Sequence, residues 1–358
     1  MKTSIQIGTA GAFSLDWKTS VDYVLEAERL GIDAVWSAEA WGQDAVSPLG
    51  YLAAKTERVI LGTGIMQISA RAPAMTAMTA MTLATLSDDR FMLGLGVSGP
   101  QVVEGLHGVR FDPPLGRLRE TVEVIKLGLR GKKIEFEGRH LRFPLPGGQG
   151  KAISIDQKPR PDLPIYLATL GPRSLHYTGR VAHGWLGTTF VPERADAVLP
   201  YIQSGAETGG RTLADLDIQV GGRLVIGDDV QRAVDTLRSA MAFQLGGMGS
   251  STRNFYNDCF RRAGFEEEAR EIQRLWHERR REEAIARVPD TMILKSNLIG
   301  TPEMVRERIR IYRDAGVTTL RLYPVGGSVD ELLGQLDQAL GLVRELENEP
   351  EAGAPAAG

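Results

Sequence analysis

The sequence has little of several features that would assign a function directly. It contains a single cysteine, Cys259, so no disulfide can form within the chain. Its five histidines show none of the HxxxH, HxH or HExxH spacings that are typical of a metal site, and we expect no bound metal. GxSxG, Walker A and cysteine-nucleophile signatures are also missing.

Long apolar runs and a strong net charge are absent too. No stretch approaches the ~18 uninterrupted apolar residues of a membrane span, and the start MKTSIQIGTAGAFSLDW lacks the apolar core of a signal peptide. The formal net charge of −3 gives no electrostatic argument for nucleic-acid binding. We therefore expect a cytoplasmic protein that acts on a small molecule, with neither nucleic acid nor membrane as a partner.

The remaining pattern predicts an α/β fold. Short runs rich in Val, Ile and Leu, as in strands buried on both faces, alternate with helical patterns. We expect strands at 4–9, 34–39, 59–66, 91–97, 164–170, 184–190, 219–227 and 318–326. Eight strands, each followed by a helix, predict a (β/α)8 TIM barrel. A Rossmann sheet is the alternative, but the turn GTAGAF after the first strand matches GxGxxG poorly.

Two long segments interrupt the alternation. Residues 131–163 resemble a hairpin and a Pro/Gly-rich loop, and form an insertion after strand four. Residues 246–299 form a second insertion, between strands seven and eight, and insertions of this length are usually lids or interfaces. We expect a single barrel domain over 1–347 and a flexible tail over 348–358.

The active site of such a barrel lies at the carboxyl ends of its strands. After strand four, the stretch LGLGVSGPQVVEGLHG (93–108) combines Gly94, Gly96 and Gly99, where the backbone can approach a planar ligand, with the polar side chains of Ser98 and Gln101. A plain strand-to-helix turn is the competing interpretation.

The neighbouring strand ends add further candidates. After strand five, Gly171 and Pro172 open a helix whose free N–H groups form an anion site, to which Arg173 adds positive charge. Glycines near the end of strand three indicate a bulge or a close approach to a ligand. Residues 188–190 and 323–327 follow strands six and eight, and are either pocket-lining or structural. Because no strong nucleophile accompanies these features, we expect a cofactor to carry the chemistry.

Three stretches resemble the bacterial-luciferase-like superfamily: VWSAEAWGQDAVSP, LGTGIMQISARAPAMTAMTAMTLATLSDDRFMLGLGVSGPQVVEGLHG and IYLATLGPRS. More narrowly, they resemble its coenzyme F420-dependent branch, the methylene-tetrahydromethanopterin reductase-like oxidoreductases. The resemblance implies a barrel that is often a homodimer and that binds the deazaflavin F420. It implies hydride transfer between F420 and a small organic substrate of the alcohol or ketone, enone or imine type.

The same resemblance implies which residues bind the cofactor. A bulge with a non-prolyl cis peptide backs the deazaflavin ring in the family, and the matching bond here joins Gly64 and Ile65. The block after strand four supplies Ser98, Gly99, Pro100, Gln101 and Val102. The phosphate site after strand five comprises Ala168, Thr169, Leu170, Gly171, Pro172 and Arg173.

Two departures from the family pattern affect the chemistry. Relatives carry an Asp-His pair after strand two, where this chain has Ala38 and Glu39. The proton carrier is therefore open among Glu39, Asp44 and His107. The family block reads EGWHG where this chain has EGLHG, with Leu106 in place of Trp.

The substrate and the cofactor leave alternatives. Trp41, Phe190, Met248, Asn254 and Tyr256 are the candidates for a substrate pocket. The superfamily also contains FMN enzymes, so an FMN-dependent monooxygenase is the first alternative. A non-catalytic barrel that only binds a flavin or deazaflavin is the second.

Overall fold

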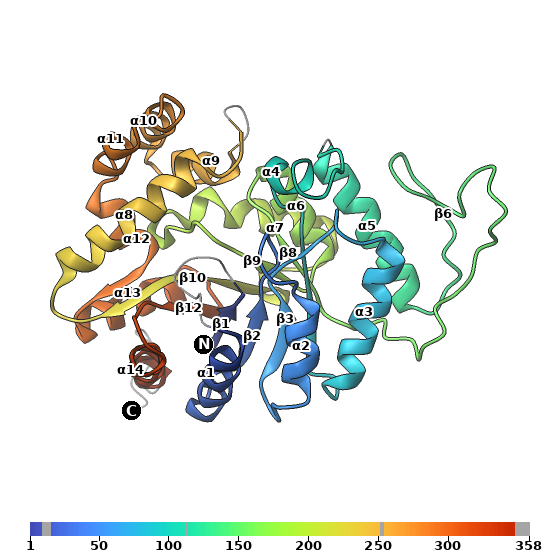
Figure 1. Cartoon of the computed structure of the whole chain (residues 1–358), viewed down its shortest axis with the longest axis horizontal. Helices are drawn as coiled ribbons and strands as arrows, with labels where there is room; N and C mark the ends of the chain where they lie inside the picture. The colour runs from blue at the N-terminus through green and yellow to red at the C-terminus, as the bar shows by residue number, and fades with distance from the viewer. Residues whose placement is uncertain (9–15, 112, 251–253, 348–358) are drawn as a thin grey trace, which may run out of the picture.

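Eight parallel strands close into a barrel in the computed structural model, which describes residues 1–8, 16–111, 113–250 and 254–347. The barrel strands are β1 (Lys2–Ile7), β2 (Ala34–Ser37), β3 (Ile60–Thr63), β5 (Phe91–Gly96), β8 (Ile165–Ala168), β9 (Gly184–Leu186), β10 (Asp217–Ile226) and β12 (Thr319–Pro324). Each strand pairs with its successor, and β12 pairs back onto β1 with Lys2 opposite Thr319. The predicted (β/α)8 barrel is confirmed, with all eight strands where the apolar runs indicated them (Figure 1).

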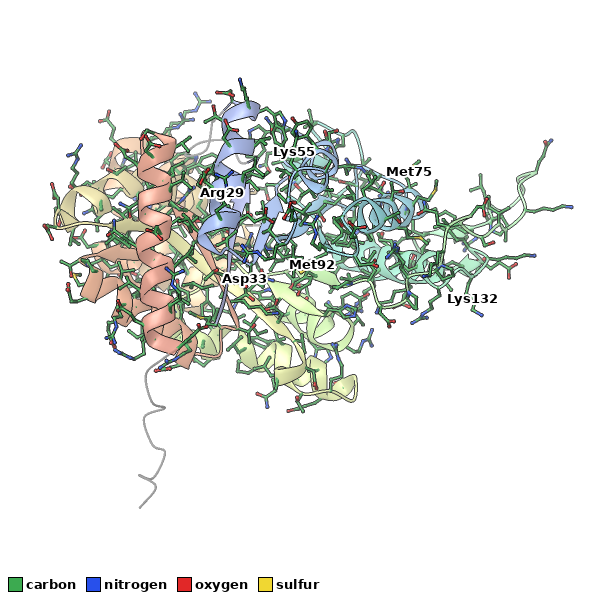
Figure 2. All side chains as sticks on the ribbon, turned by 90° about the horizontal axis from the view of Figure 1, so that it is seen from below. Arg29, Asp33, Lys55, Met75, Met92 and Lys132 are labelled. Carbon is green, nitrogen blue, oxygen red and sulfur yellow. The ribbon has the colours of Figure 1, made fainter. Side chains whose placement is uncertain are left out.

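The outer layer is helical. It contains α1 (Trp17–Leu30), α2 (Val46–Ala53), α3 (Pro73–Leu86), α5 (Pro114–Leu129), α6 (Pro172–Val181), α7 (Leu199–Thr208), α8 (Val230–Gly246), α13 (Pro302–Asp314) and α14 (Val329–Glu347). Figure 2 shows α14 beside α1, which completes the ring between the last strand and the first. No helix in the described part of the chain is long and apolar enough to cross a membrane.

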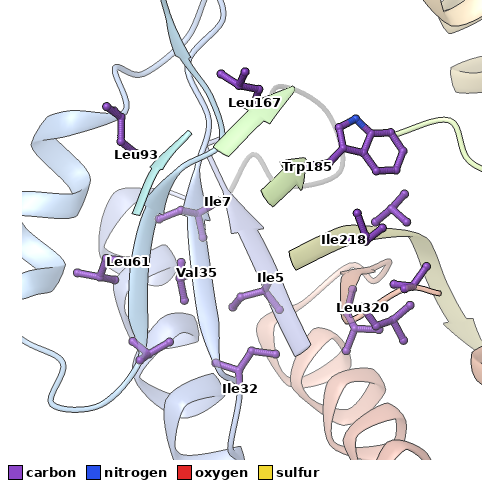
Figure 3. Close-up of a cluster of buried hydrophobic side chains, with 14 of the residues drawn as sticks. Ile5, Ile7, Ile32, Val35, Leu61, Leu93, Leu167, Trp185, Ile218 and Leu320 are labelled. Atoms are coloured by element: carbon purple, nitrogen blue, oxygen red, sulfur yellow. The ribbon is translucent and has the colours of Figure 1, made fainter. Parts of the chain in front are cut away.

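The main core lies between the strands and this helical layer. Alternate strand residues such as Ile5, Ile7 and Val35 point outward and join one continuous cluster of buried side chains (Figure 3). The opposite alternate positions point into the barrel, as the two-residue period of a strand requires. The strands are therefore buried on both faces, which explains their nearly unbroken apolar runs.

The barrel interior is partly polar. Trp36 is fully buried there, packs edge-on against Tyr166 with ring centroids 5.3 Å apart, and donates from Nε1 to Gln219 Oε1 at 2.9 Å. At the amino end of β10, Asp217 accepts from the hydroxyls of Tyr166 (2.9 Å) and Thr319 (2.8 Å). The glycine at position 62 makes room for the indole, because a Cβ there would lie 2.4 Å from the Trp36 ring.

A bulge interrupts the pairing of β3 with β5. The ladder stops after Gly62 and resumes at Met66 in β4 (Met66–Gln67), and the Gly64–Ile65 peptide between them is cis, as the family resemblance implies. The Thr63 hydroxyl bridges the gap, donating to the Gly94 carbonyl at 2.8 Å and accepting from the Gly94 N–H at 2.9 Å. Gly94 thus serves contact between strands, and the expectation that it admits a ligand is corrected: a Cβ would lie 1.9 Å from the Thr63 carbonyl oxygen.

The two predicted insertions differ in character. The first contains the small antiparallel hairpin β6 (Phe136–Glu137) and β7 (Arg142–Phe143), and it projects from the barrel beyond α3 and α5 (Figure 1). The second contains α9 (Phe255–Arg262), α10 (Glu266–His277), α11 (Arg281–Ala286) and α12 (Asp290–Ser296), which pack with α8 around their own apolar cluster. It ends in β11 (Leu298–Gly300), which the sequence did not indicate and which pairs with the end of β10. The predicted tail at 348–358 lies outside the described residues.

The contact between Gly94 and β3 makes a stability prediction. We expect Gly94→Ala to lower the free energy of unfolding by about 3 kcal/mol, because the methyl group forces the two strands apart. Urea denaturation measures the change. Gly334→Ala in α14 is the control: its Cβ meets nothing within 4 Å, and it should gain about 0.5–1 kcal/mol. Equal destabilisation of the two variants would contradict this interpretation of the β3–β5 contact.

Candidate active site

The block after β5 forms one wall at the carboxyl ends of the strands. Ser98 adopts a left-handed conformation with φ 58°, uncommon for a residue with a side chain, and turns the chain into the short helix α4 (Pro100–Val103). The Gln101 side chain donates to the Gly249 carbonyl in the second insertion and so ties α4 to it. Gly99 has extended backbone, and a Cβ there would meet only Gln101 Oε1, at 3.8 Å, so the space beside it is open. Val102, by contrast, is buried.

The start of α6 lies on the neighbouring strand β8. Gly171 caps the helix in an extended conformation, Pro172 occupies its first turn, and the exposed Arg173 follows. A Cβ at Gly171 would meet only Ser174 Oγ, at 3.6 Å. The Ser174 and Leu175 N–H groups donate to the Gly171 carbonyl at 3.0 and 2.9 Å. The start of α6 therefore offers an anion the Arg173 N–H, the Arg173 side chain and the helix dipole.

Two residues of the predicted phosphate loop are held by other contacts. The Thr169 hydroxyl is 2.7 Å from that of Thr178, and its carbonyl accepts from Trp185 Nε1 at 2.8 Å. The Leu170 carbonyl accepts from Arg262 Nη2 at 2.6 Å. The side chain of Thr169 thus braces the loop, while Ala168 packs against the apolar cluster inside the barrel.

The bulge after β3 presents Ile65 between these two walls. The half-buried Ile65 packs against the inner cluster of Trp36, Tyr166 and their neighbours. It is seated on Gly96, where a Cβ would lie 2.9 Å from Ile65 Cδ1. Gly96 therefore lets the Ile65 side chain approach the strand. The sequence had predicted that a planar ligand approaches Gly96, and that prediction is corrected.

Several buried polar atoms around these strand ends have no hydrogen-bond partner among the described residues. They are Ser37 Oγ at the end of β2, Gln67 Oε1 in β4, Ser69 Oγ just beyond it and His107 Nε2 after α4. An unsatisfied buried polar atom typically costs about 1–3 kcal/mol. A polar, planar ligand supplies such partners, so these residues fit a flavin-like cofactor.

Glu39 is the most firmly held of the three candidate proton carriers. Its carboxylate accepts two bonds from Arg71 Nη1, at 2.7 and 2.8 Å, and further bonds from the backbone N–H groups of Gln67 and Ala45, both at 3.2 Å. The Glu39 side chain is only 8% exposed. This arrangement favours a role in joining the loop after β2 to β4 over proton transfer.

The other two candidate proton carriers, Asp44 and His107, differ in how far hydrogen bonds hold their side chains. Asp44 accepts from the N–H groups of Val46 and Ser47, both at 2.8 Å, at the start of α2. Burial acts to raise the pKa of Asp44, but the bonds from Ser47 and Val46 outweigh it and hold the pKa below its ordinary value. His107 alone retains a ring nitrogen without a partner among the described residues.

Comparison with known proteins decides the family. A sequence model of luciferase-like monooxygenases matches residues 2–319. The chain belongs to this luciferase-like family. The resemblance on the blocks around residues 93–108 and 165–174 is thereby confirmed.

The similar proteins point to one branch of the luciferase-like family. A protein of Mycobacterium tuberculosis named as a coenzyme F420-dependent oxidoreductase is 37% identical over 328 residues, covering 89% of this chain and 94% of that protein. The 5,10-methylenetetrahydromethanopterin reductase of Methanolobus tindarius is 28% identical over 83% of this chain and 87% of its own length. The structure of the F420-dependent tetrahydromethanopterin reductase of Methanopyrus kandleri superposes with a TM-score of 0.77 at 24% identity, covering 94% of this chain and 97% of that one, which shows the fold.

The predicted substrate residues of this luciferase-like protein do not all lie together. Phe190 is 1% exposed and packs between Trp185 and Tyr312 in the main core, so its placement in a substrate pocket is corrected. Asn254 is likewise used structurally: its Oδ1 caps α9 and its Nδ2 donates to the Leu245 carbonyl at 2.7 Å. Three candidates stay open to contact: Trp41 is 54% exposed, and Met248 and Tyr256 are half-buried.

Two arginines inside the barrel strands escaped the sequence analysis. Arg223 in β10 and Arg321 in β12 both stack on the Tyr323 ring, with Cζ 5.9 and 5.4 Å from its centroid. The sequence did contain a signal for them, since both arginines lie within predicted buried strands. A charged residue is rarely buried unless it has a partner.

A separate cavity of about 330 Å³ lies at the other end of the barrel. It is lined by residues 158–164 together with Ala84, Asp89 and Phe91, and none of the predicted site residues borders it. The amino end of a barrel usually serves stability. Among the described residues, no group of three or more His, Cys, Asp or Glu side chains is arranged to hold a metal ion.

The Glu39–Arg71 pair makes the second prediction. Removing one partner of a buried ion pair typically costs about 3–5 kcal/mol, and Arg71 is itself partly exposed, so we expect Arg71→Met to cost about 3 kcal/mol. Thermal and urea unfolding measure it. Arg29→Met removes the solvent-exposed pair with Glu26 and should change stability by less than about 0.5 kcal/mol. An unchanged unfolding midpoint for Arg71→Met would show that Glu39 is free for other roles.

Proposed function

We propose that this luciferase-like protein is an F420-dependent oxidoreductase that transfers a hydride between F420 and a small organic substrate. The observation that carries the proposal is the set of buried polar atoms without a partner among the described residues, at the end of β2, in and just after β4, and after α4. The relatives support the deazaflavin over FMN, because the Mycobacterium tuberculosis and Methanopyrus kandleri proteins described above are named for F420.

Each wall of the site has a role in holding the cofactor. Ile65 offers an apolar surface for a planar ring, and Ser98 and Gly99 border the space beside it. The Arg173 N–H and side chain at the start of α6, with the helix dipole, would bind a phosphate. When bound, F420 supplies the hydride donor or acceptor.

We further propose His107 as the group that holds or moves the proton accompanying the hydride. Glu39 is committed to Arg71, and Asp44 caps α2. The Nε2 of His107 is the nitrogen left without a partner in the described structure. An alcohol or ketone, an enone or an imine would each need such a proton. The homodimer and the cytoplasmic location also stay predictions of the sequence.

The direct test of cofactor choice is a fluorescence titration of the purified protein with F420 beside FMN. We expect F420 to bind in the micromolar range or tighter and FMN at least tenfold more weakly. The reverse order would assign the chain to flavin monooxygenases. Tight F420 binding without turnover on any alcohol, ketone, enone or imine would favour a binding protein.

Gly99 provides the sharpest mutational test of the cofactor site. Because its backbone is extended and the space beside it is open, Gly99→Val should fold normally while its side chain occupies the ligand's position. We expect F420 affinity to fall at least tenfold, which corresponds to about 1.4 kcal/mol. Gly150→Val, whose Cβ meets nothing within 4 Å and which lies in the first insertion, should leave affinity unchanged. Equal affinities of Gly99→Val and the wild type would remove this block from the cofactor site.

A further inference from the structure

The two arginines of the barrel interior have no negative partner in the part of the chain that the structure describes. Arg321 donates from Nη1 to the Gly187 carbonyl at 3.1 Å and from Nη2 to Gln6 Oε1 at 2.5 Å, and both acceptors are neutral. The Arg223 guanidinium makes no hydrogen bond or ion pair with the described residues, and it stacks on the Tyr323 ring with Cζ 5.9 Å from the ring centroid. The barrel wall formed by β10 and β12 therefore carries two uncompensated positive charges.

Nearby carboxylates do not supply the missing charge. Asp217 is the other charged residue of β10, but it precedes Arg223 by six positions, about 20 Å along a strand. Its oxygens are taken by Tyr166, Gln219, Thr318 and Thr319.

Leaving a half-buried guanidinium unpaired is unfavourable, since desolvation of the charge is not offset by an opposite charge. Burial lowers the pKa of Arg223, against the opposing effect of Tyr323, which agrees with this environment. In contrast, the buried Glu39 has its own arginine. An external anion would offset the cost at Arg223, and the planar fork of an arginine matches a carboxylate or phosphate in two-point contact.

The position of Arg223 relative to the cofactor walls indicates what that anion belongs to. In the closed barrel β10 and β12 lie opposite β3 and β5, which carry Ile65 and Ser98. The phosphate candidate at the start of α6 follows β8, on a different part of the rim. Burial, with smaller effects of Cys259 and Tyr323, raises the pKa of Tyr256 in the second insertion.

We propose that the substrate carries an oxyanion group, a carboxylate or a phosphate, which Arg223 binds while the rest of the molecule faces Ile65. The Tyr256 hydroxyl, half-buried and without a hydrogen-bond partner among the described residues, is a second donor to that group. Arg321, which is hydrogen-bonded to Gln6 and Gly187, adds positive electrostatic potential at this site without contacting the anion. This inference rests on the proposed function, because it treats β3 and β5 as the cofactor wall.

Calorimetric titration of the F420-loaded full chain tests the proposal. The probes are crotonate, its neutral methyl ester and inorganic phosphate, and the variants are Arg223→Gln and Arg223→Lys. Arg130→Gln, an exposed residue that ends α5, is the matched control. We expect crotonate or phosphate to bind the wild type and Arg130→Gln alike, and Arg223→Gln at least tenfold more weakly. Arg223→Lys should be intermediate, because it keeps the charge but loses the fork.

The outcomes separate the sources of the anion. If Arg223→Gln weakens binding of crotonate and the methyl ester does not bind, the substrate carries a carboxylate. If Arg223→Gln weakens binding of phosphate alone, the substrate carries a phosphate. Equal anion affinity in wild type and Arg223→Gln, or no anion binding to the wild type, overturns the proposal.

Separate F420 titrations of every variant distinguish the two hypotheses. We expect the dissociation constant for F420 to stay within twofold. A tenfold loss in Arg223→Gln would assign the arginine to the cofactor and overturn the inference. If the wild type failed to bind F420, the anion titrations would be run on the full chain without it, and anion binding through Arg223 there would leave the anion site standing while the proposed function fell.

Discussion

The Thr63 hydroxyl joins β3 to β5 at the point where their backbone ladder is interrupted. By bonding both backbone groups of Gly94, it keeps the barrel closed while residues 64 and 65 leave the ladder. Ile65 can then lie on Gly96 and present an apolar surface between the two polar strand ends. The position of Ile65 therefore depends on the Thr63 hydroxyl, whose two hydrogen bonds replace the backbone bonds that β3 and β5 lack at this point.

The barrel separates its stabilising and its chemical parts by the direction in which strand residues point. Outward residues such as Ile5 and Val35 join the continuous core under the helices. Inward residues are more polar, with Asp217 fully satisfied near the amino end and Arg223 unpaired near the carboxyl end. The satisfied carboxylate holds the structure together, whereas the unpaired guanidinium is available to a ligand.

Much of the fold could be predicted because local pattern and tertiary structure agree in it. The apolar runs indicated every barrel strand. By contrast, β11 has only three residues and exists because β10 extends past β9 to meet it. No pattern within residues 298–300 contains that information.

The site was predictable at the level of loops and less so at the level of side chains. The blocks at 98–102 and 168–173 lie at the strand ends where they were expected. Whether a side chain there faces a ligand or the core depends on packing: Phe190 fills a space beside Trp185, and Asn254 caps a helix. Glycines were the hardest to interpret, because Gly94 and Gly99 look alike in sequence, yet one touches a strand and the other open space.

A crystal structure of the protein grown with F420 is the most direct test of the central claim. The account predicts the deazaflavin ring against Ile65 and beside Ser98 and Gly99, with the phosphate at the first N–H groups of α6. It also predicts that the face of the ring away from Ile65 is turned toward Arg223 and Tyr323. A ring bound elsewhere, or the phosphate of F420 bound at Arg223, would contradict it.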